Sequence, residues 1–352
     1  MSRFFSSKYN CLIPYTPGEQ PKDMQYIKLN TNESPFAPSK MAQERAANAA
    51  KNLQLYSDPE CRDLVEAVAK YFAVQTDEII FTNGSDEILN FAFMAFCESG
   101  AVFPDITYGF YPVFAQLNGV EYSEIPLQDD FTINISDYKS IGKTIFIANP
   151  NAPTGIVLAA SEIEEIVKAN PDNVVVIDEA YVDFGAESVV PLIKKYNNLL
   201  VTQTFSKSRS LAGGRLGFGI GCKELIRDLN TIKYSTNPYN VNRMTEAAGI
   251  GALEDDEYYK TNCGKIKENR QWTANELKRL GFIMTDSYAN FLFAKHSVVG
   301  GKEIYLRLKE KGVLVRHFDK SGLRDYNRIT IGSREQMQSF IQILEEVLKE
   351  LL

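Results

Sequence analysis

Short apolar runs alternate with amphipathic stretches through the first two thirds of the chain. Continuous runs predict five strands, at residues 79–83, 144–150, 173–180, 199–205 and 216–221. Several are rich in β-branched residues and do not alternate with polar ones, which is typical of strands buried on both faces of a parallel sheet. Between them, residues 161–170 have helical spacing, with Ser161 and Glu164 as a predicted capping box. The alternation predicts an α/β fold with a mostly parallel sheet flanked by helices.

The pattern changes towards the C-terminus. A long amphipathic stretch over 258–282 leads into short strands at 290–295, 313–318 and 328–333. A final helix is predicted after Ser333, with Gln336 completing its capping box. These features predict a smaller α+β domain.

The predicted organisation has three parts. Residues 1–40 contain five prolines and are expected to form an N-terminal arm. Residues 41–258 are expected to form the large α/β domain, and residues 259–352 the small domain. A chain of 352 residues is long for one core, in agreement with two domains.

Composition narrows the class of protein. The formal net charge is −7, so the chain lacks the basic surplus of a dedicated nucleic-acid binder. No stretch approaches the roughly 18 apolar residues that cross a bilayer, and the first residues lack the apolar segment of a signal peptide. Five scattered cysteines and two histidines form no metal-binding pattern. We therefore expect a cytoplasmic protein with free thiols, no metal, and no nucleic-acid or membrane partner.

Two side chains with chemical potential follow neighbouring predicted strands. Asp178 follows the apolar residues of the run at 173–180, and Lys207 follows the run at 199–205. Because ligands of open α/β sheets gather at the carboxyl ends of the strands, one cleft is expected to hold both residues. Neither identifies a site alone, since most lysines are solvated and an aspartate in this position is often a turn residue.

Three more features follow strands, one of them a further predicted strand just before Tyr108. Gly84 and Ser85 precede an amphipathic helix, whose N-terminal N–H groups suit a phosphate, although Ser85 is equally suited to cap the helix. Tyr108 is a ring that can stack on a flat cofactor, and 149–155 is a polar, turn-rich loop. A lysine, a carboxylate and a phosphate site are the parts that hold pyridoxal phosphate.

The motifs "VVVIDEAYVDF", "TFSKSRSLAGGRLG", "NPNAPTG" and "TNGSDEIL" resemble those of fold-type I pyridoxal-phosphate aminotransferases. The motifs "IPYTPGEQ", "KLNTNESPFAPS", "QLYSDPE" and "NPYNVN" are similar to those of the histidinol-phosphate aminotransferase branch. The resemblance spans about residues 12–335. It implies a seven-stranded, mostly parallel sheet in the large domain, a smaller α+β domain, and pyridoxal 5'-phosphate as the cofactor.

The resemblance also implies roles for individual residues. Lys207 would form the Schiff base and shuttle the substrate's proton, while Asp178 would bind the ring nitrogen. Tyr181 would bind the ring hydroxyl oxygen, and Tyr108 would stack on the ring. The cofactor phosphate would be held by the N–H groups of Ser85 and Asp86, by Ser206 and Arg215, and by Tyr56 of a neighbouring subunit in a homodimer.

On the substrate side, the resemblance implies that Arg328 binds an anion with the help of Arg316. Tyr15 would contact a substrate phosphate, and Asn32 would lie near it. The substrates would be a small amino donor and a 2-oxo acid.

One position departs from the family's pattern. The family has an asparagine directly before Pro-Thr-Gly that binds the ring oxygen, and here that residue is Ala152. Asn151 could take over from one position earlier, or Tyr181 could carry the contact alone. Gly214 also replaces what is often a larger apolar residue.

The implied function is transamination between histidinol phosphate and 2-oxoglutarate in histidine biosynthesis. The same scaffold also serves a threonine-phosphate decarboxylase or an aromatic amino-acid aminotransferase. A pyridoxal-phosphate-binding regulatory protein is the alternative that is not an enzyme.

Overall fold

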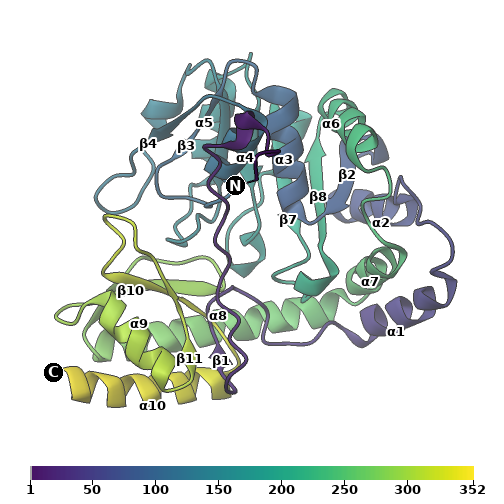
Figure 1. Cartoon of the computed structure of the whole chain (residues 1–352). Coiled ribbons are helices and arrows are strands. Elements are labelled where there is room, and N and C mark those ends of the chain that lie inside the picture. Colours follow the sequence, from purple (N-terminus) through teal and green to yellow (C-terminus); the bar gives the residue numbers. More distant parts are fainter. Residues whose placement is uncertain (1) are drawn as a thin grey trace.

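The structure is a computed structural model that describes residues 2–352. A large domain built on a twisted sheet lies above a smaller domain, and the N-terminal segment runs between the two (Figure 1). The long helix α8, Asp256–Arg279, passes beneath the large domain and continues into the small one.

The large domain contains a seven-stranded sheet in the order β2-β8-β7-β6-β5-β3-β4. Among the strands of residues 2–352 in this sheet, β8 alone runs against the other six, so the prediction of a mostly parallel sheet is confirmed. The strands are β2 (Ile79–Asn83), β3 (Ala101–Pro104), β4 (Tyr122–Ile125), β5 (Thr144–Ala148), β6 (Val175–Asp178), β7 (Leu199–Thr204) and β8 (Leu216–Gly221).

Two layers of helices cover this sheet, and alternate residues of each strand face opposite layers. Ile145 and Ile147 of β5 pack in one core, whereas Phe146 packs in the other. Because both faces are buried, both sets of positions are apolar, which explains the continuous apolar runs. The helices of this domain are α1 (Lys40–Ala49), α2 (Arg62–Phe72), α3 (Ser85–Phe96), α4 (Tyr111–Asn118), α5 (Ala160–Ala169), α6 (Lys223–Thr236) and α7 (Arg243–Glu254).

The small domain has an antiparallel sheet in the order β12-β13-β10-β9, packed against helices. A separate two-stranded pair joins β1 of the N-terminal segment to β11. The elements are β1 (Ile27–Lys28), β9 (Phe282–Met284), β10 (Phe291–His296), α9 (Gly301–Glu310), β11 (Val313–Leu314), β12 (Arg316–His317), β13 (Tyr326–Thr330) and α10 (Arg334–Leu351).

Local predictions have mixed outcomes. The capping box of Ser333 and Gln336 is confirmed at the start of α10. The box predicted at Ser161 and Glu164 is wrong, because α5 begins at Ala160 and Glu162 accepts the N–H of the preceding Ala159 at 2.7 Å. Glu164 instead binds side chains outside the helix.

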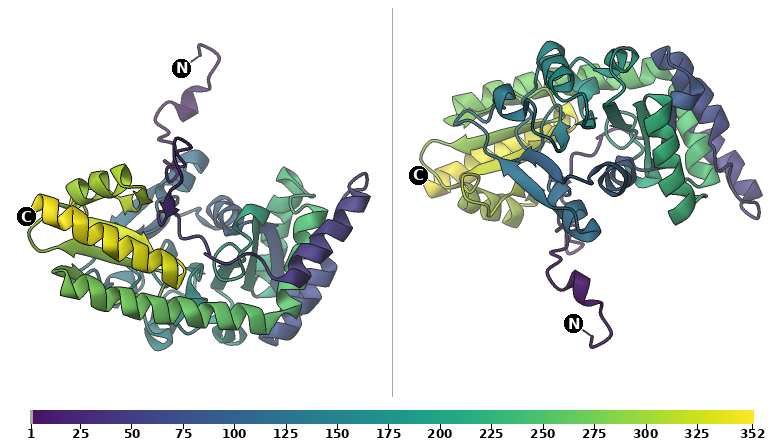
Figure 2. Two further views of the ribbon diagram at one scale, coloured as in Figure 1. Left: turned by 90° about the horizontal axis from the view of Figure 1, so that it is seen from below. Right: turned by 90° about the horizontal axis from the view of Figure 1, so that it is seen from above.

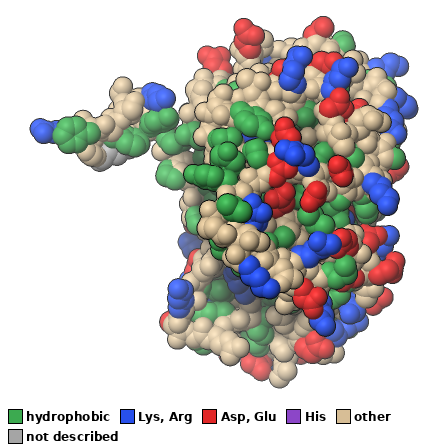
Figure 3. All heavy atoms as spheres, turned by 90° about the vertical axis from the view of Figure 1, so that its right-hand side faces the viewer, with side chains coloured by type: hydrophobic (Ala, Val, Ile, Leu, Met, Phe, Trp, Pro, Cys, Tyr) green, Lys and Arg blue, Asp and Glu red, His purple; other side chains and the backbone are tan. Residues whose placement is uncertain are grey.

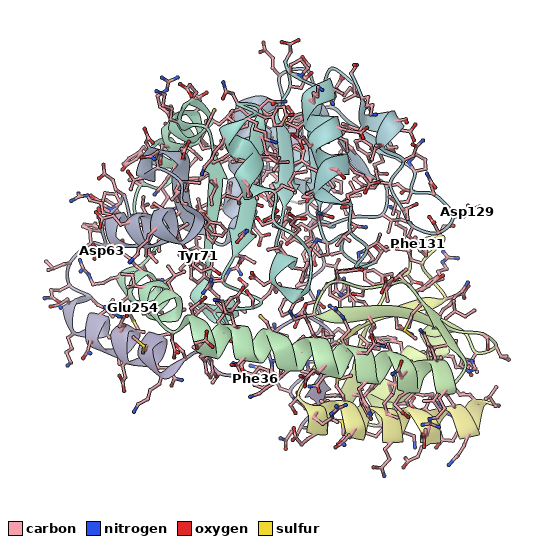
Figure 4. The ribbon with its side chains drawn as sticks, turned by 180° about the vertical axis from the view of Figure 1, so that it is seen from behind. Phe36, Asp63, Tyr71, Asp129, Phe131 and Glu254 are labelled. Atoms are coloured by element: carbon pink, nitrogen blue, oxygen red, sulfur yellow. The ribbon has the colours of Figure 1, made fainter. Side chains whose placement is uncertain are left out.

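The predicted boundary at residue 258 stays a prediction, because no break in the chain falls there. Residue 258 falls in the first turn of α8, so this helix belongs to both halves of the fold. The middle of the proline-rich arm pairs with the small domain, since Ile27 and Lys28 lie beside β11, whereas the arm's last residue, Lys40, begins α1 of the large domain. In the other direction, Phe131 of the large domain packs edge-on against Phe293 and Tyr326 of the small-domain sheet. Figure 4 labels Phe131 on the side of the large domain that faces the small one.

The first residues of the described chain project from the body of the molecule (Figure 2). Basic and acidic side chains are interspersed over the face shown in Figure 3, as expected for solvated helix surfaces. Within residues 2–352, no helix combines the length and the apolar character that a membrane span requires.

Candidate active site

The carboxyl ends of β5, β6 and β7 and the N-terminus of α3 surround one cavity. Residues predicted to bind the cofactor phosphate or ring meet there with Lys207. Its lining residues are Ser85, Asp86, Tyr108, Ala148, Ala152, Asp178, Ala180, Tyr181, Thr204, Ser206, Lys207 and Arg215.

Lys207 lies on the loop that follows β7. Its Nζ atom is 3.3 Å from the carbonyl oxygen of Thr31 and 5.8 Å from the centroid of the Tyr181 ring. The next residue fixes the loop, because Ser208 Oγ donates a hydrogen bond of 2.6 Å to Asp183 Oδ2. The half-buried amine therefore has no acidic partner within ion-pairing distance in residues 2–352.

Asp178 is the last residue of β6 and is 5% exposed. Burial raises the pKa of its carboxyl to about 7, and the charge of Asp86 adds to the increase. Hydrogen bonds from the Ala180 N–H, Thr202 and Tyr111 act in the opposite direction. Since no Lys or Arg of residues 2–352 forms an ion pair with it, this carboxylate lacks a cation.

A second part of the cavity has the features of an anion site. Gly84 takes a left-handed φ of 80° just before α3, whose first N–H groups have no partner inside the helix. The guanidinium of Arg215 lies directly over Gly84, where a Cβ atom would be 2.6 Å from Nη2. On the other side, Gly217 approaches so closely that a Cβ would be 2.3 Å from the Ser85 nitrogen. Ser206 is buried nearby.

Tyr108 and Arg215 are held by the same carboxylate. The Tyr108 hydroxyl donates to Asp86 Oδ1 at 2.7 Å, and Arg215 Nη2 lies 3.0 Å from Asp86 Oδ2. Burial, followed by the charge of Asp86, raises the pKa of Tyr108 well above its usual value. The ring of Tyr108 is thereby kept neutral and fixed at the cavity wall.

A second cavity adjoins the first and shares Tyr108 and Ala152 with it. It brings together Tyr15, Arg316 and Arg328, which were predicted to bind the substrate, and adds Phe318 and Lys320.

The three predicted substrate residues of this cavity come from the arm and the small domain. Tyr15 stacks on Phe110 with ring centroids 4.2 Å apart. Arg316 donates to the carbonyl oxygens of Thr16 and Pro17 at 3.0 and 3.2 Å.

Arg328 donates to the Asn30 carbonyl oxygen at 3.1 Å, while its buried Nε has no partner in the described chain. Burial lowers the pKa of this guanidinium. A buried cation with unused donors is suited to an anionic ligand.

Three residues that were predicted to bind the cofactor or the substrate, Asn151, Asn32 and Tyr56, line neither cavity. The Asn151 amide binds the Ile106 carbonyl, Thr154 and Thr107, and Ala152 rather than Asn151 lines the cavity. The structure therefore gives no support to Asn151 as a ligand of the ring oxygen.

Asn32 is 1% exposed, and its side chain binds Tyr181 and Thr330. Tyr56 is 78% exposed and stacks on Tyr239, with ring centroids 4.5 Å apart.

Other residues of the site were missed from the sequence. Tyr111 and Thr202 bind Asp178 from a helix and a neighbouring strand, and Thr204 lines the cavity. The burial of Tyr111 and its bond to Asp178 arise from the packing of the fold, so the local sequence carried no signal for this role. A Cβ at Gly214, the second departure from the family's pattern, would make ordinary van der Waals contacts with Leu211 and Thr245 at 3.6 and 3.8 Å, and nothing in the structure explains the glycine there.

The cavity fits pyridoxal 5'-phosphate. The ring nitrogen of this cofactor, when protonated, supplies the cation that Asp178 lacks. The two close glycine contacts, the helix N-terminus and Arg215 suit its phosphate, and the unpaired amine of Lys207 suits its aldehyde.

The sequence matches the profile of the family "Aminotransferase class I and II" over residues 24–344. It is 49% identical to the histidinol-phosphate aminotransferase of Brachyspira hyodysenteriae, over 99% of this chain and the whole of that protein. It is 46% identical over the full length of both chains to the enzyme of the same name from Clostridium botulinum.

Solved structures agree on the fold. The histidinol-phosphate aminotransferase from Clostridium acetobutylicum superposes with a TM-score of 0.85 at 26% identity, covering 92% of this chain and 99% of that one. The enzyme from Sinorhizobium meliloti, solved in complex with pyridoxal-5'-phosphate, gives a TM-score of 0.91 at 23% identity over 100% and 99%. The chain therefore belongs to the class I and II aminotransferase family, in the branch that contains the histidinol-phosphate aminotransferases.

Proposed function

We propose that the protein transfers an amino group between histidinol phosphate and 2-oxoglutarate, as a step of histidine biosynthesis in the cytoplasm. The observation that carries this proposal is the meeting of Lys207, Asp178 and an anion site in one cavity. Relatives named histidinol-phosphate aminotransferases at 46–49% identity over the whole chain support this choice of substrate.

The residues of the first cavity hold the cofactor, which supplies an electron sink for the electrons of the broken C–H bond. Asp178 keeps the ring nitrogen protonated, since a buried carboxylate stabilises a nearby positive charge. The backbone N–H groups of Ser85 and Asp86, with Ser206 and Arg215, bind the phosphate. Tyr108 stacks on the ring, and Tyr181 donates to the ring hydroxyl oxygen.

Lys207 has two roles. With the cofactor bound, its amine would form a carbon–nitrogen double bond to the aldehyde, with release of water. Once an amino donor has displaced it, the free Nζ would be placed to take the proton from the carbon that bears the amino group and to pass it to C4′ of the cofactor. Such positioned general acid–base catalysis contributes about 10²–10⁴-fold to a rate. The free amine in the structure is consistent with both roles.

The second cavity binds the anionic group of each substrate. Arg328 and Arg316 bind the phosphate of one substrate and the carboxylate of the other. A guanidinium can pair with either group through two N–H donors. Tyr15 closes the cavity from the arm and contacts the substrate phosphate.

The active unit in this proposal is a homodimer with shared sites. Tyr56 is exposed at 78% although it is a large aromatic residue, and its neighbour Leu55 is 58% exposed. Exposed aromatic and apolar residues in one loop are typical of an interface. Tyr56 reaches the cofactor phosphate of the second subunit.

A steady-state panel of amino donors with 2-oxoglutarate tests the proposal. Histidinol phosphate should be turned over, and Lys207→Ala should abolish this activity, whereas the exposed control Lys194→Ala should retain it. Turnover of phenylalanine without turnover of histidinol phosphate would contradict the proposed substrate. Release of carbon dioxide from threonine phosphate would contradict the proposed reaction.

A further inference from the structure

Asn32 connects the small domain to Tyr181 of the cofactor cavity. It follows β1 and takes a left-handed φ of 56°, a conformation that asparagine tolerates better than most residues. Its backbone N–H donates to Thr330 Oγ1 at 3.0 Å, and its carbonyl oxygen accepts from Asn290 Nδ2 at 3.0 Å. The main chain at Asn32 is thus fixed to β13 and to the loop before β10.

The hydrogen bonds determine which way the Asn32 amide points. Thr330 Oγ1 accepts the Asn32 N–H, and its own hydrogen goes to Asn32 Oδ1 at 3.0 Å. If the amide were reversed, the hydroxyl of the buried Thr330 would have no acceptor within the described residues. An unsatisfied buried hydroxyl is costly, so the observed orientation is favoured.

This orientation has a consequence for Tyr181. Asn32 Nδ2 faces the Tyr181 hydroxyl and donates to its oxygen at 2.9 Å. A tyrosine hydroxyl has one hydrogen, and here that hydrogen is not needed for the bond to Asn32. Residues 2–352 provide no other acceptor for it, and Tyr181 lines the cofactor cavity.

We infer that Asn32 is a positioning residue that keeps Tyr181 a hydrogen-bond donor towards the cofactor, and not a ligand of the substrate. Both polar atoms of its side chain are already bound, and only 1% of the residue is exposed. The role matters more in this chain because Ala152 presents only a methyl group to the same cavity. The inference rests on the proposed function, since it requires pyridoxal phosphate in the cavity.

The hydrogen bond from Tyr181 should affect the pH at which the visible absorption of the bound cofactor changes. A donor that faces the ring oxygen stabilises the negative charge on that oxygen. The nitrogen through which Lys207 is joined to the cofactor then has a lower pKa. Asn32→Asp replaces the donor by an acceptor of the same shape, and Tyr181 then donates to Asp instead. The visible absorption of the bound cofactor should titrate at a pH higher by about one to two units, the size expected when a charged group loses one hydrogen bond.

The test compares Asn32→Asp, Tyr181→Phe and the double variant as holoenzymes, by visible absorption against pH. Both single variants should shift the titration upward, and the double variant should shift it no further than Tyr181→Phe alone. Additive shifts would mean that Asp acts only through its charge and would overturn the inference. An Asn32→Asp enzyme that titrates like the wild type would also overturn it.

Two further controls keep these outcomes interpretable. If Asn32→Asp does not fold, Asn32→Gly removes the side chain and tolerates the positive φ. It should shift the titration in the wild-type background but not in the Tyr181→Phe background, and a shift in both backgrounds would overturn the inference. A wild-type protein that takes up no pyridoxal phosphate would refute the proposed function and this inference together, whereas an unshifted variant of a normal holoenzyme refutes the inference alone.

Discussion

The two adjoining cavities share Tyr108 and Ala152 but are built in different ways. The cofactor cavity is built on one sheet: its side chains stand near the ends of neighbouring strands, and the arm adds hydrogen bonds between Thr31 and Lys207 and between Asn32 and Tyr181. The substrate cavity combines the arm, the large domain and the small domain, through Tyr15, Tyr108 and Arg328. Changes in the first should therefore impair cofactor binding and kcat. Changes in the second should act mainly on KM, because they alter how an anion is bound.

The largest effect is expected for Asp178→Asn in the cofactor cavity. The amide keeps the shape but loses the charge that pairs with the ring nitrogen. Breaking a buried ion pair costs about 3–5 kcal/mol, so kcat should fall roughly 10²–10⁴-fold. Steady-state kinetics at saturating cofactor measure this. A fall of less than tenfold would mean that Asp178 does not pair with the ring.

The substrate cavity should respond less strongly. Arg328→Met removes a buried guanidinium with an unpaired Nε, and KM for the anionic substrate should rise by about 10–100-fold, as for one hydrogen-bonded charge. Arg316→Met should raise KM less, because that guanidinium already binds two carbonyl oxygens of the arm. Equal effects on kcat from both variants would contradict the proposed division between the cavities.

The stability of the cofactor-free protein should depend on pH because of two adjacent acids. Burial raises the pKa of both Asp178 and Glu179 to about 7, above the values near 4 of unfolded chains. Between these pKa values the folded state therefore binds more protons than the unfolded state. The free energy of unfolding should fall as the pH rises from about 4 to 7. In Asp178→Asn this decrease should be smaller.

Thermal melts of the cofactor-free wild type, Asp178→Asn and the exposed control Asp137→Asn across this range measure the effect. The melting temperatures of the three proteins should be most alike near pH 4. Above pH 7, Asp178→Asn should have the highest melting temperature. Identical melts of wild type and Asp178→Asn at high pH would show that the buried carboxylate carries no cost.

The smallest effects are expected when either of two glycines is replaced by alanine. A Cβ at Gly217 would clash with the Ser85 nitrogen at 2.3 Å, so Gly217→Ala should displace the start of α3 and weaken cofactor binding. Gly264, within α8, has open space around it, and Gly264→Ala should raise stability by about 1 kcal/mol without affecting the cofactor. Cofactor titrations and denaturant melts measure both. Equal cofactor affinity in the two variants would refute the close packing proposed at the phosphate site.

The same contrast explains what the sequence could predict. Strand ends were predictable, because apolar runs such as the one ending at Asp178 reveal buried strands and polar residues mark where they stop. The edge strand β4 was not predicted, since its side chains are exposed or half-buried and form no continuous apolar run. The reversal of β8 was also missed, because the direction of a strand depends on its connections and not on its composition.

Side-chain partners were harder to predict than positions. Asn32 and Asn151 were both placed near the site by resemblance, yet their amides bind groups far away in the sequence, such as Thr330 and Ile106. Such contacts depend on how the domains pack, and no local pattern encodes them. Likewise, the helix that contains Glu164 begins earlier than Ser161 suggests, because Glu162 satisfies the same backbone requirement.

The central claim is that Lys207 binds the aldehyde of pyridoxal phosphate, and borohydride reduction followed by peptide mass mapping tests it most directly. Reduction of the reconstituted protein converts the carbon–nitrogen bond into a stable link, and the added mass should appear on the peptide that contains Lys207. Lys207→Ala should carry no such mass. A label on another lysine, or an unlabelled Lys207 peptide in a protein that binds the cofactor, would contradict the account.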